Sequence, residues 1–474
     1  MKKESAQRLK YVLADYATAN VAWLLFNCLR YGMKPLRGFD SLDDFLFSPM
    51  VLAGQVLFPF VMLGVYWLSG YYNEVFRKSR LGELLITLSS SIANTAIIFF
   101  VALTNDMMRD NRGYNYELIF VLLGVFFFLT YLPRLVHTTI TSRKIKSRQL
   151  SFKTLVIGAG DMAYAFVKKL DSMQLSLGYK VVGYVAIPAE NRRQGHDDDR
   201  PVYALDEVAQ VCQREGIQEL IVIPSQQNSA ISLETIDQLF LLNLPVKIAL
   251  DRYNVLLSKA RLSNMSGDPL IDISSSTMSE GEKNVKRALD VLSSAIMLVL
   301  LLPVFLLVGV VIKCDSKGPV FYSQKRVGRH NVLFNIYKFR SMCINAERDN
   351  KPQLSSDGDP RITRVGHVLR KYRIDELPQF WNVLRGDMSL VGPRPERQFF
   401  AQQILEREPA YSLIHQVRPG ITSLGMVKYG YAKSVDEMMD RLRYDLLYID
   451  NMSLINDLKI LVYTIKIVFN GRGL

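Results

Sequence analysis

The chain has 474 residues, 49% of them hydrophobic, and a formal net charge of +13 at pH 7. It is too long for one hydrophobic core, so we expect two or three domains. The positive charge favours anionic partners, and the scattered cysteines (four) and histidines (five) argue against a disulfide framework or a histidine-rich zinc site.

Residues 1–148 contain four apolar stretches, each with roughly the 20 residues that a bilayer-crossing helix needs. Basic clusters follow the second and fourth stretches, so the positive-inside rule predicts that both ends of this region are cytoplasmic. Asp15 lies within the first stretch, where it is either functional or paired inside the bundle; we favour pairing. The stretches cover 11–29, 50–72, 84–104 and 118–140.

Residues 149–255 alternate β-branched runs with helical patterns, which predicts a doubly wound α/β domain of the Rossmann type. The first strand runs into Gly158-Ala-Gly160-x-x-Ala163, the glycine-rich turn of dinucleotide-binding folds. No acidic residue closes the second strand, where such sites normally have one. We therefore interpret the domain as regulatory or oligomerising rather than as an NAD(P) site. Residues 256–282 lack periodicity and are interpreted as a linker.

A further apolar stretch of 22 residues runs from Val291 to Ile312, with Pro303 near its middle. Basic residues flank both ends, which marks both ends as cytoplasmic. Because proline can bend a helix back, we predict a re-entrant membrane helix at about 288–313 rather than a fifth crossing. Residues 338–348 and 458–469 have helical apolar spacing, which fits either an ordinary buried helix face or an interfacial amphipathic helix. Beside the re-entrant stretch, we favour the interfacial helices.

The most informative stretch places two adjacent acids, Asp375 and Glu376, between a basic run before them and Arg394 after them. Acid flanked by base suits phosphoryl transfer, because a carboxylate can attack or hold a metal while fixed cations hold phosphates. The following segment predicts a helix that begins near Asp375 and ends at Gly386. Helical geometry turns Glu376 about 100° from Asp375, so the two acids are expected to do different jobs. Hard carboxylate oxygen suits Mg²⁺.

The last 190 residues or so resemble the catalytic domain of the monotopic polyprenyl-phosphate hexose-1-phosphate transferases, the bacterial sugar transferases. Four spans plus a Rossmann-like domain resemble the long undecaprenyl-phosphate galactose- or glucose-phosphotransferase type. The strings that carry the resemblance are KRALD (286–290), GPVFYSQKRVG (318–328), FNIYKFRSM (334–342), DELPQFWNVLRGDMSLVGPRP (375–395), VRPGIT (417–422) and YDLLYIDNMSLINDLKIL (444–461).

The resemblance implies that Asp375 attacks the β-phosphate of a UDP-sugar, that UMP leaves, and that polyprenyl phosphate then takes the phosphosugar. It implies that Glu376 is a Mg²⁺ ligand and that other polar residues bind substrate. Those residues are Lys338, Arg340, Arg370, Arg394, Arg418 and Asp445. It implies a membrane enzyme that initiates exopolysaccharide, capsule or O-antigen synthesis, placed in the bacterial inner membrane with its catalytic domain in the cytoplasm and forming a homodimer.

The chain departs from the family in two strings. Leu302-Pro303 stands where the family's helix break often has Ser-Pro, and Ser423-Leu-Gly425-Met-Val427 replaces Gly-x-Ala-Gln-Val. The second departure means that sugar specificity cannot be copied from relatives.

Two other functions remain open from the sequence. A membrane glycosyltransferase would release UDP, and Asp357-Gly358-Asp359 or Asp197-Asp198-Asp199 would then bind the metal. A non-catalytic scaffold or sensor of polysaccharide export would leave the charges of 370–395 unused. We find no recognised nucleic-acid-binding motif.

Overall fold

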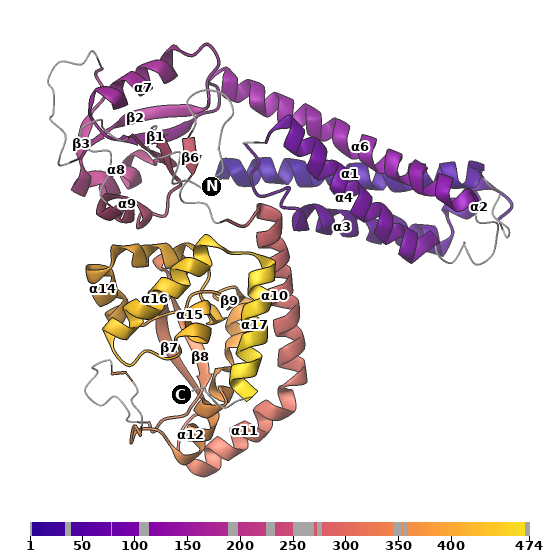
Figure 1. The fold of residues 1–474 in the computed structure, drawn as a ribbon. Helices are drawn as coiled ribbons and strands as arrows, with labels where there is room; N and C mark the ends of the chain where they lie inside the picture. Colours follow the sequence, from indigo (N-terminus) through magenta and orange to yellow (C-terminus); the bar gives the residue numbers. More distant parts are fainter. Residues whose placement is uncertain are drawn as a thin grey trace. The chain divides into compact units, whose positions relative to one another are not determined.

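The structure, a computed structural model, forms two compact units, which are Met1–Leu150 with Met278–Val285, and Ser151–Thr277 with Lys286–Leu474 (Figure 1). The residues that it describes are 2–33, 39–76, 78–103, 113–187, 198–223, 233–249, 270–272, 277–344, 353–354 and 358–469.

The first unit is built around four long helices, each long and apolar enough to cross a membrane, which confirms the four predicted spans. Helix α1 packs against α3 and α6, and α4 packs against α3 and α6. The bounds are α1 (Lys2–Met33), α2 (Leu42–Leu46), α3 (Pro49–Leu68), α4 (Arg80–Ile98), a π-helical turn η1 (Phe99–Leu103) and α6 (Gly113–Lys146).

The interior of this bundle contains the predicted partner of Asp15. Arg134 of α6 donates from Nη2 to Asp15 Oδ2 over 2.7 Å, and both side chains are buried. Tyr72 also donates to Asp15 Oδ2, at 2.8 Å. The acid in the first span is therefore paired within the bundle.

The second unit begins with a six-stranded sheet in the order β3-β2-β1-β4-β5-β6. The first five strands are parallel and β6 is antiparallel to β5, which confirms the α/β prediction. Strand β6 falls inside the stretch interpreted as a linker, so that interpretation missed an edge strand. The bounds are β1 (Phe152–Ile157), α7 (Asp161–Ser172), β2 (Tyr179–Ala186), β3 (Val202–Ala204), η2 (Leu205–Glu207), α8 (Val208–Glu215), β4 (Glu219–Val222), α9 (Leu233–Phe240), β5 (Val246–Ala249) and β6 (Leu270–Asp272).

Two helices, α10 (Glu280–Leu300) and α11 (Leu302–Asp315), occupy the predicted re-entrant stretch and are bent by 59° at their break. Pro303 lies in the first turn of α11. Backbone N–H groups in a first turn have no partner within the helix, so proline costs no helical hydrogen bond there. Such a bent pair is either a broken span or a re-entrant loop. Asp290 of α10 accepts from Ser389 Oγ over 2.7 Å, which ties this helix to residues 389–391.

Residues 333–339 form a strand, so the amphipathic helix predicted for 338–348 is wrong in its described part. Strand β8 (Leu333–Phe339) pairs antiparallel with β7 (Phe321–Val327). The ring of Phe339 stacks on Phe321 at 5.3 Å, and Arg340 N donates to Val320 O at 2.9 Å. Apolar spacing along one segment could not show this hairpin partner. Residues 345–348 lie outside the described residues.

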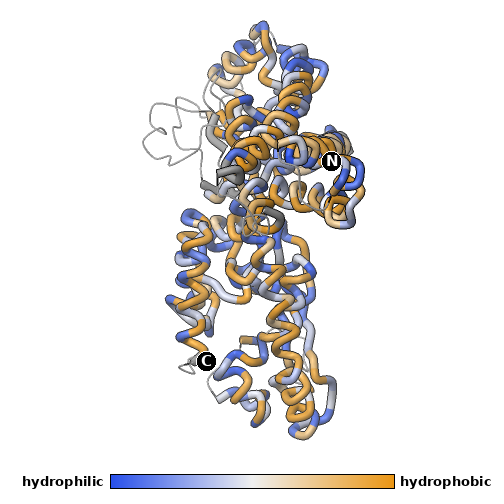
Figure 2. The backbone as a smooth tube through the Cα atoms, turned by 90° about the vertical axis from the view of Figure 1, so that its right-hand side faces the viewer, coloured by the Kyte–Doolittle hydropathy of each residue, from blue (hydrophilic) through white to orange (hydrophobic). Residues whose placement is uncertain are grey.

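The rest of the C-terminal region is mostly helical, as predicted. Helix α17 confirms the helix predicted at 458–469, and hydrophobic residues, orange in Figure 2, occur along the helices of both units. Leu458 and Val462 are exposed large apolar side chains on α17. The elements are η4 (Arg329–Asn331), α12 (Arg364–Lys371), η5 (Ile374–Glu376), α13 (Gln379–Arg385), β9 (Ser389–Val391), α14 (Gln398–Arg407), η6 (Pro409–Gln416), β10 (Gly420–Thr422), α15 (Leu424–Lys428), α16 (Val435–Asp450) and α17 (Leu454–Phe469).

Candidate active site

The two adjacent acids lie in η5, a 3₁₀ turn that precedes α13. Arg373 enters this turn in the left-handed region with φ 54°, and Pro378 is the N-cap of α13. Asp375 therefore precedes the helix in a turn of its own and is not the helix cap. Both acids are buried, with 6% of Asp375 and 3% of Glu376 exposed.

Asp375 lines a cavity of about 730 Å³, whereas Glu376 is not among the residues that line it. The lining also includes Lys338, Arg370 and Arg394, which are three of the predicted phosphate-binding residues. The structure thus assembles a carboxylate and several cations, drawn from β8, α12 and the turn after β9, around one cavity. This is the layout that a phosphorylated substrate requires.

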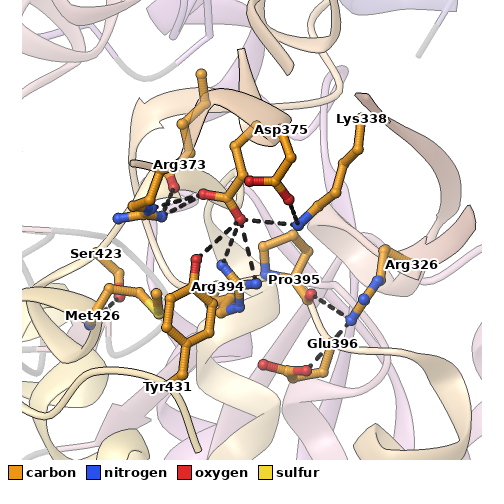
Figure 3. Close-up of polar contacts among 12 residues, drawn as sticks. Arg326, Lys338, Arg373, Asp375, Arg394, Pro395, Glu396, Ser423, Met426 and Tyr431 are labelled. Carbon is orange, nitrogen blue, oxygen red and sulfur yellow. Dashed lines mark hydrogen bonds and ion pairs between the residues drawn. The ribbon is translucent and has the colours of Figure 1, made fainter. Parts of the chain in front are cut away.

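Glu376 accepts hydrogen bonds from the surrounding cations. Its Oε1 accepts from Lys338 Nζ at 2.9 Å and lies 3.4 Å from Arg394 Nη1. Its Oε2 accepts from Arg373 Nε at 2.9 Å. Tyr431 Oη donates to Oε1 over a longer 3.4 Å, and the Tyr431 ring lies 4.9 Å from the Arg394 guanidinium. Figure 3 shows dashed contacts from Arg373, Arg394, Lys338 and Tyr431 that meet at one carboxylate.

These contacts move the pKa values of the two acids in opposite directions. Burial disfavours the charge on Glu376, but Arg373, Lys338 and Arg394 outweigh it and hold the pKa of that carboxyl well below its usual range. Burial raises the pKa of Asp375, and Lys338, 4.0 Å away, offsets only part of that effect. Glu376 therefore takes the shorter contacts with the cations, while Asp375 keeps only the long ion pair with Lys338 and faces the cavity.

Glycines explain why the two proline-arginine motifs lie together. Strand β9 pairs in parallel with β10, and Gly420 N donates to Pro393 O at 2.9 Å. A Cβ on Gly392 would overlap the Arg418 carbonyl, and one on Gly420 would overlap the Gly392 backbone. The Gly-Pro-Arg-Pro and Arg-Pro-Gly strings thus allow two backbones to approach closely and fix the turn that presents Arg394.

Three predicted substrate-binding residues have other contacts. Arg340 lines the cavity, but its guanidinium donates to Ser316 O at 2.7 Å at the end of α11. Arg418 Nε donates to Gly386 O at 3.0 Å, and Asp445 accepts from Gly425 N at 3.0 Å. Neither Arg418 nor Asp445 lines the cavity. Their geometry suits holding the backbone.

Sequence reasoning missed a second charge cluster on the cavity wall. Glu396 forms ion pairs with Arg441 and with Arg326, at 2.5 and 3.5 Å. Burial lowers the pKa of Arg326 to about 10. Tyr431 was missed as well. Arg326 and Glu396 stand in or beside the family strings, but no local pattern marks Tyr431 or Arg441.

The donor set fits Mg²⁺ only when phosphates are present. Among the described residues, no group of three His, Cys, Asp or Glu side chains could hold a metal. Glu376 and Asp375 offer two carboxylates, and both oxygens of Glu376 already accept from cationic donors. Mg²⁺ usually keeps several waters and takes one or two carboxylates plus substrate phosphates. Bound phosphates would both draw cations from Glu376 and supply the missing oxygen ligands.

Comparisons with known proteins place the C-terminal part of the chain in a known family. The model of the family described as "Bacterial sugar transferase" matches residues 281–471. The UDP-N-acetylgalactosamine-undecaprenyl-phosphate N-acetylgalactosaminephosphotransferase of Aeromonas hydrophila is 48% identical over 189 residues, 40% of this chain and 44% of that relative. The UDP-glucose:undecaprenyl-phosphate glucose-1-phosphate transferase of Escherichia coli K12 is 31% identical over 323 residues, 67% and 68% of the two chains. The enzyme of the same name from Klebsiella pneumoniae is 38% identical over 221 residues, 46% of each chain. The match to the Aeromonas and Klebsiella relatives thus spans less than half of their length.

Proposed function

Because the chain belongs to the bacterial sugar transferase family, we propose that it transfers a sugar 1-phosphate from a UDP-sugar to undecaprenyl phosphate. The observation that carries this proposal is the division between adjacent acids. Asp375 faces the cavity, while Glu376 lies among Lys338, Arg373 and Arg394. A nucleophile needs a free lone pair. The neighbouring cations make their shorter ion pairs with Glu376, which leaves an oxygen of Asp375 available to attack.

In the first half-reaction, an Asp375 oxygen attacks the β-phosphorus of the UDP-sugar. A bond forms between that oxygen and the phosphorus, and the bond to the oxygen bridging the two phosphates breaks. UMP leaves with the bridging oxygen, and the sugar phosphate stays on Asp375 as an acyl phosphate. Lys338, Arg370 and Arg394 surround the developing charge on the phosphate oxygens, which lowers the barrier.

In the second half-reaction, a phosphate oxygen of undecaprenyl phosphate attacks the same phosphorus. The bond from phosphorus to Asp375 breaks, the carboxylate returns, and undecaprenyl diphosphosugar forms. Each step transfers a phosphoryl group between oxygens, so neither an oxidant nor a reductant is needed. One cationic cavity can serve both half-reactions because the two substrates are phosphates that occupy it in turn.

We propose that Glu376 and the substrate phosphates hold Mg²⁺ beside this cavity. When bound, Mg²⁺ would neutralise part of the phosphate charge.

The membrane helices fit a lipid-linked acceptor. We propose that the chain lies in the bacterial cytoplasmic membrane with its catalytic domain on the cytoplasmic side. Lys286 and Arg287, which precede the apolar stretch within α10, and Lys317 after α11 favour a re-entrant hairpin there, with both ends in the cytoplasm. The product would start exopolysaccharide, capsule or O-antigen assembly, and a homodimer remains our prediction for the assembly.

The rival metal motifs gain no support. Asp359 pairs with Arg361, and Asp198 accepts from Tyr184, while Asp357 and Asp197 lie outside the described residues. We therefore keep glycosyltransfer and scaffolding only as outcomes of the test.

The test uses the purified full chain in nanodiscs with Mg²⁺, undecaprenyl phosphate and a panel of UDP-sugars. UMP release with one donor, and a phosphosugar adduct on the Asp375 peptide by mass spectrometry, are expected. UDP release would instead indicate glycosyltransfer, and donor binding without turnover would indicate a scaffold. Normal UMP release from Asp375→Asn would overturn the nucleophile assignment.

A further inference from the structure

The Rossmann-like domain contacts the catalytic domain at the turn that follows α9. Both domains belong to the second compact unit. Asn243 Nδ2 donates to His330 O at 3.3 Å, and Asn243 Oδ1 lies 3.2 Å from His330 Nδ1. One amide thus meets both the backbone and the side chain of a residue 87 positions away.

Both partners adopt left-handed backbone conformations, which are uncommon for residues other than glycine but most accessible to asparagine, aspartate and histidine. Asn243 has φ 54° and His330 has φ 58°, in the left-handed region that few side chains favour. Asn331, next to His330 in the β7–β8 turn, has φ 60°. Strained residues of this kind persist where the surrounding structure holds them, so this contact and the hairpin turn support one another.

An apolar contact lies alongside this polar one. Helix α9 packs against η6 of the catalytic domain. Leu413 of η6 packs into the core cluster that contains Leu239 and Phe240 of α9. The hydrophobic core of the Rossmann-like domain therefore extends onto the catalytic domain at this point.

These contacts reach two elements of the catalytic domain, the β7–β8 hairpin and η6. The hairpin carries cations of the cavity, and η6 precedes the strand that fixes the turn of Arg394. The β7–β8 hairpin holds Arg326 and Lys338, and His330 is in its turn. Segment η6 leads directly into β10, whose Gly420 N donates to Pro393 O beside Arg394. Arg329 Nε donates to Gln416 O at 3.0 Å, which ties the hairpin turn to the end of η6.

We propose that the Rossmann-like domain is a positioning element for the phosphate-binding side of the cavity. Asn243 holds the hairpin turn and α9 holds η6, so that Lys338 and Arg394 stay aligned for a substrate phosphate. Asn243 and His330 touch no substrate and act only through these elements. This inference rests on the proposed function for its kinetic consequence but not for its structural one.

The test replaces each partner by glycine, which accepts a left-handed backbone and so removes only side-chain contacts. The variants are Asn243→Gly and His330→Gly in the full chain. The matched control is Asn331→Gly, in the same turn and with the same backbone conformation, whose side chain makes no hydrogen bond to a described residue. His330→Asn is the conservative variant, because asparagine tolerates this conformation and keeps a polar side chain.

The first readout is hydrogen exchange in nanodiscs, which does not depend on turnover. Amides of 326–338 and 416–422 should exchange about threefold faster in Asn243→Gly and His330→Gly, the size expected from losing one exposed hydrogen-bond contact. Unchanged exchange, or an equal change in Asn331→Gly, would overturn the proposal. If the wild-type chain turns over no sugar nucleotide, the proposed function fails while this result still stands.

The second readout is steady-state UMP release. The KM for the UDP-sugar should rise about threefold in the two glycine variants with kcat little changed, because loosened cations weaken binding of the substrate phosphate. His330→Asn should restore most of the affinity. Faster exchange with an unaltered KM would overturn the positioning role, since the contact would then not reach the cavity.

Discussion

The N-terminal bundle and the catalytic cavity each bury a cluster of charges, but only one cluster is balanced. In the bundle, Asp15 and Arg134 form a direct ion pair, in which one acid meets one cation. In the cavity region, four cations surround two acids, and one acid takes most of the contacts. These residues are Lys338, Arg370, Arg373 and Arg394 around Asp375 and Glu376.

The difference shows what each cluster can do. A buried pair with matched charges is complete in itself and contributes to holding helices together. A buried cluster with surplus positive charge favours an anion, and phosphates of a substrate would complete it. Charge balance, more than burial, separates a structural cluster from a substrate site.

The largest expected effect comes from removing the nucleophile. Asp375→Asn should lower kcat for UMP release by at least about 1,000-fold, because Glu396, the other carboxylate among the described cavity-lining residues, is paired with Arg441 and Arg326. Thermal stability should change little, since the raised pKa shows that ionising Asp375 is already unfavourable. A large loss of stability in this variant would mean that Asp375 balances the cations after all.

The next effect compares the two clusters directly. Glu376→Gln and Asp15→Asn should each lower the free energy of unfolding by about 3 kcal/mol, because each leaves buried cations unpaired. Only Glu376→Gln should also lower kcat per folded molecule, since its cations line the cavity. Melting curves and UMP release in nanodiscs measure both quantities. Equal kinetic losses in the two variants would contradict the assignment of separate roles.

The pH dependence tests how Asp375 is tuned. Its pKa is raised, so UMP release should increase with pH through a value above that of an ordinary aspartate, as the attacking carboxylate forms. Lys338 lowers that pKa by its charge, so Lys338→Met should move the acidic limb to higher pH. The exposed Lys371→Met is the control and should leave the limb in place. An acidic limb that Lys338→Met does not shift would assign it to another group.

The smallest effect concerns Tyr431. Its hydroxyl is 3.4 Å from Glu376 Oε1, a long contact, so Tyr431→Phe should reduce kcat/KM only about twofold to threefold. Tyr431→Leu also removes the ring beside Arg394 and should cost more. Tyr429 lines the same cavity, so Tyr429→Phe is the matched control, and its kcat/KM is expected to stay unchanged. Equal losses in Phe and Leu variants would show that the ring contributes nothing.

Patterns with a local cause were predicted well. Four apolar stretches became four long helices because a span must satisfy its own backbone and cover its length with apolar residues. The α/β alternation gave the six-stranded sheet, and Gly386 ends α13 in the left-handed conformation with φ 98°. The segment 338–348 failed because a strand needs a partner, and the partner strand is earlier in the chain.

The sequence by itself determined the spans, the alternation of strands and helices, and the pair Asp375–Glu376 with basic residues on both sides, because each depends on neighbours in the chain. Only the tertiary structure decided which acid faces the cavity and which lies among cations. It also decided that Arg418 and Asp445 hold backbone, and that Tyr431, Glu396 and Arg441 join the site. Those outcomes depend on contacts between segments far apart in the chain, which no local pattern encodes.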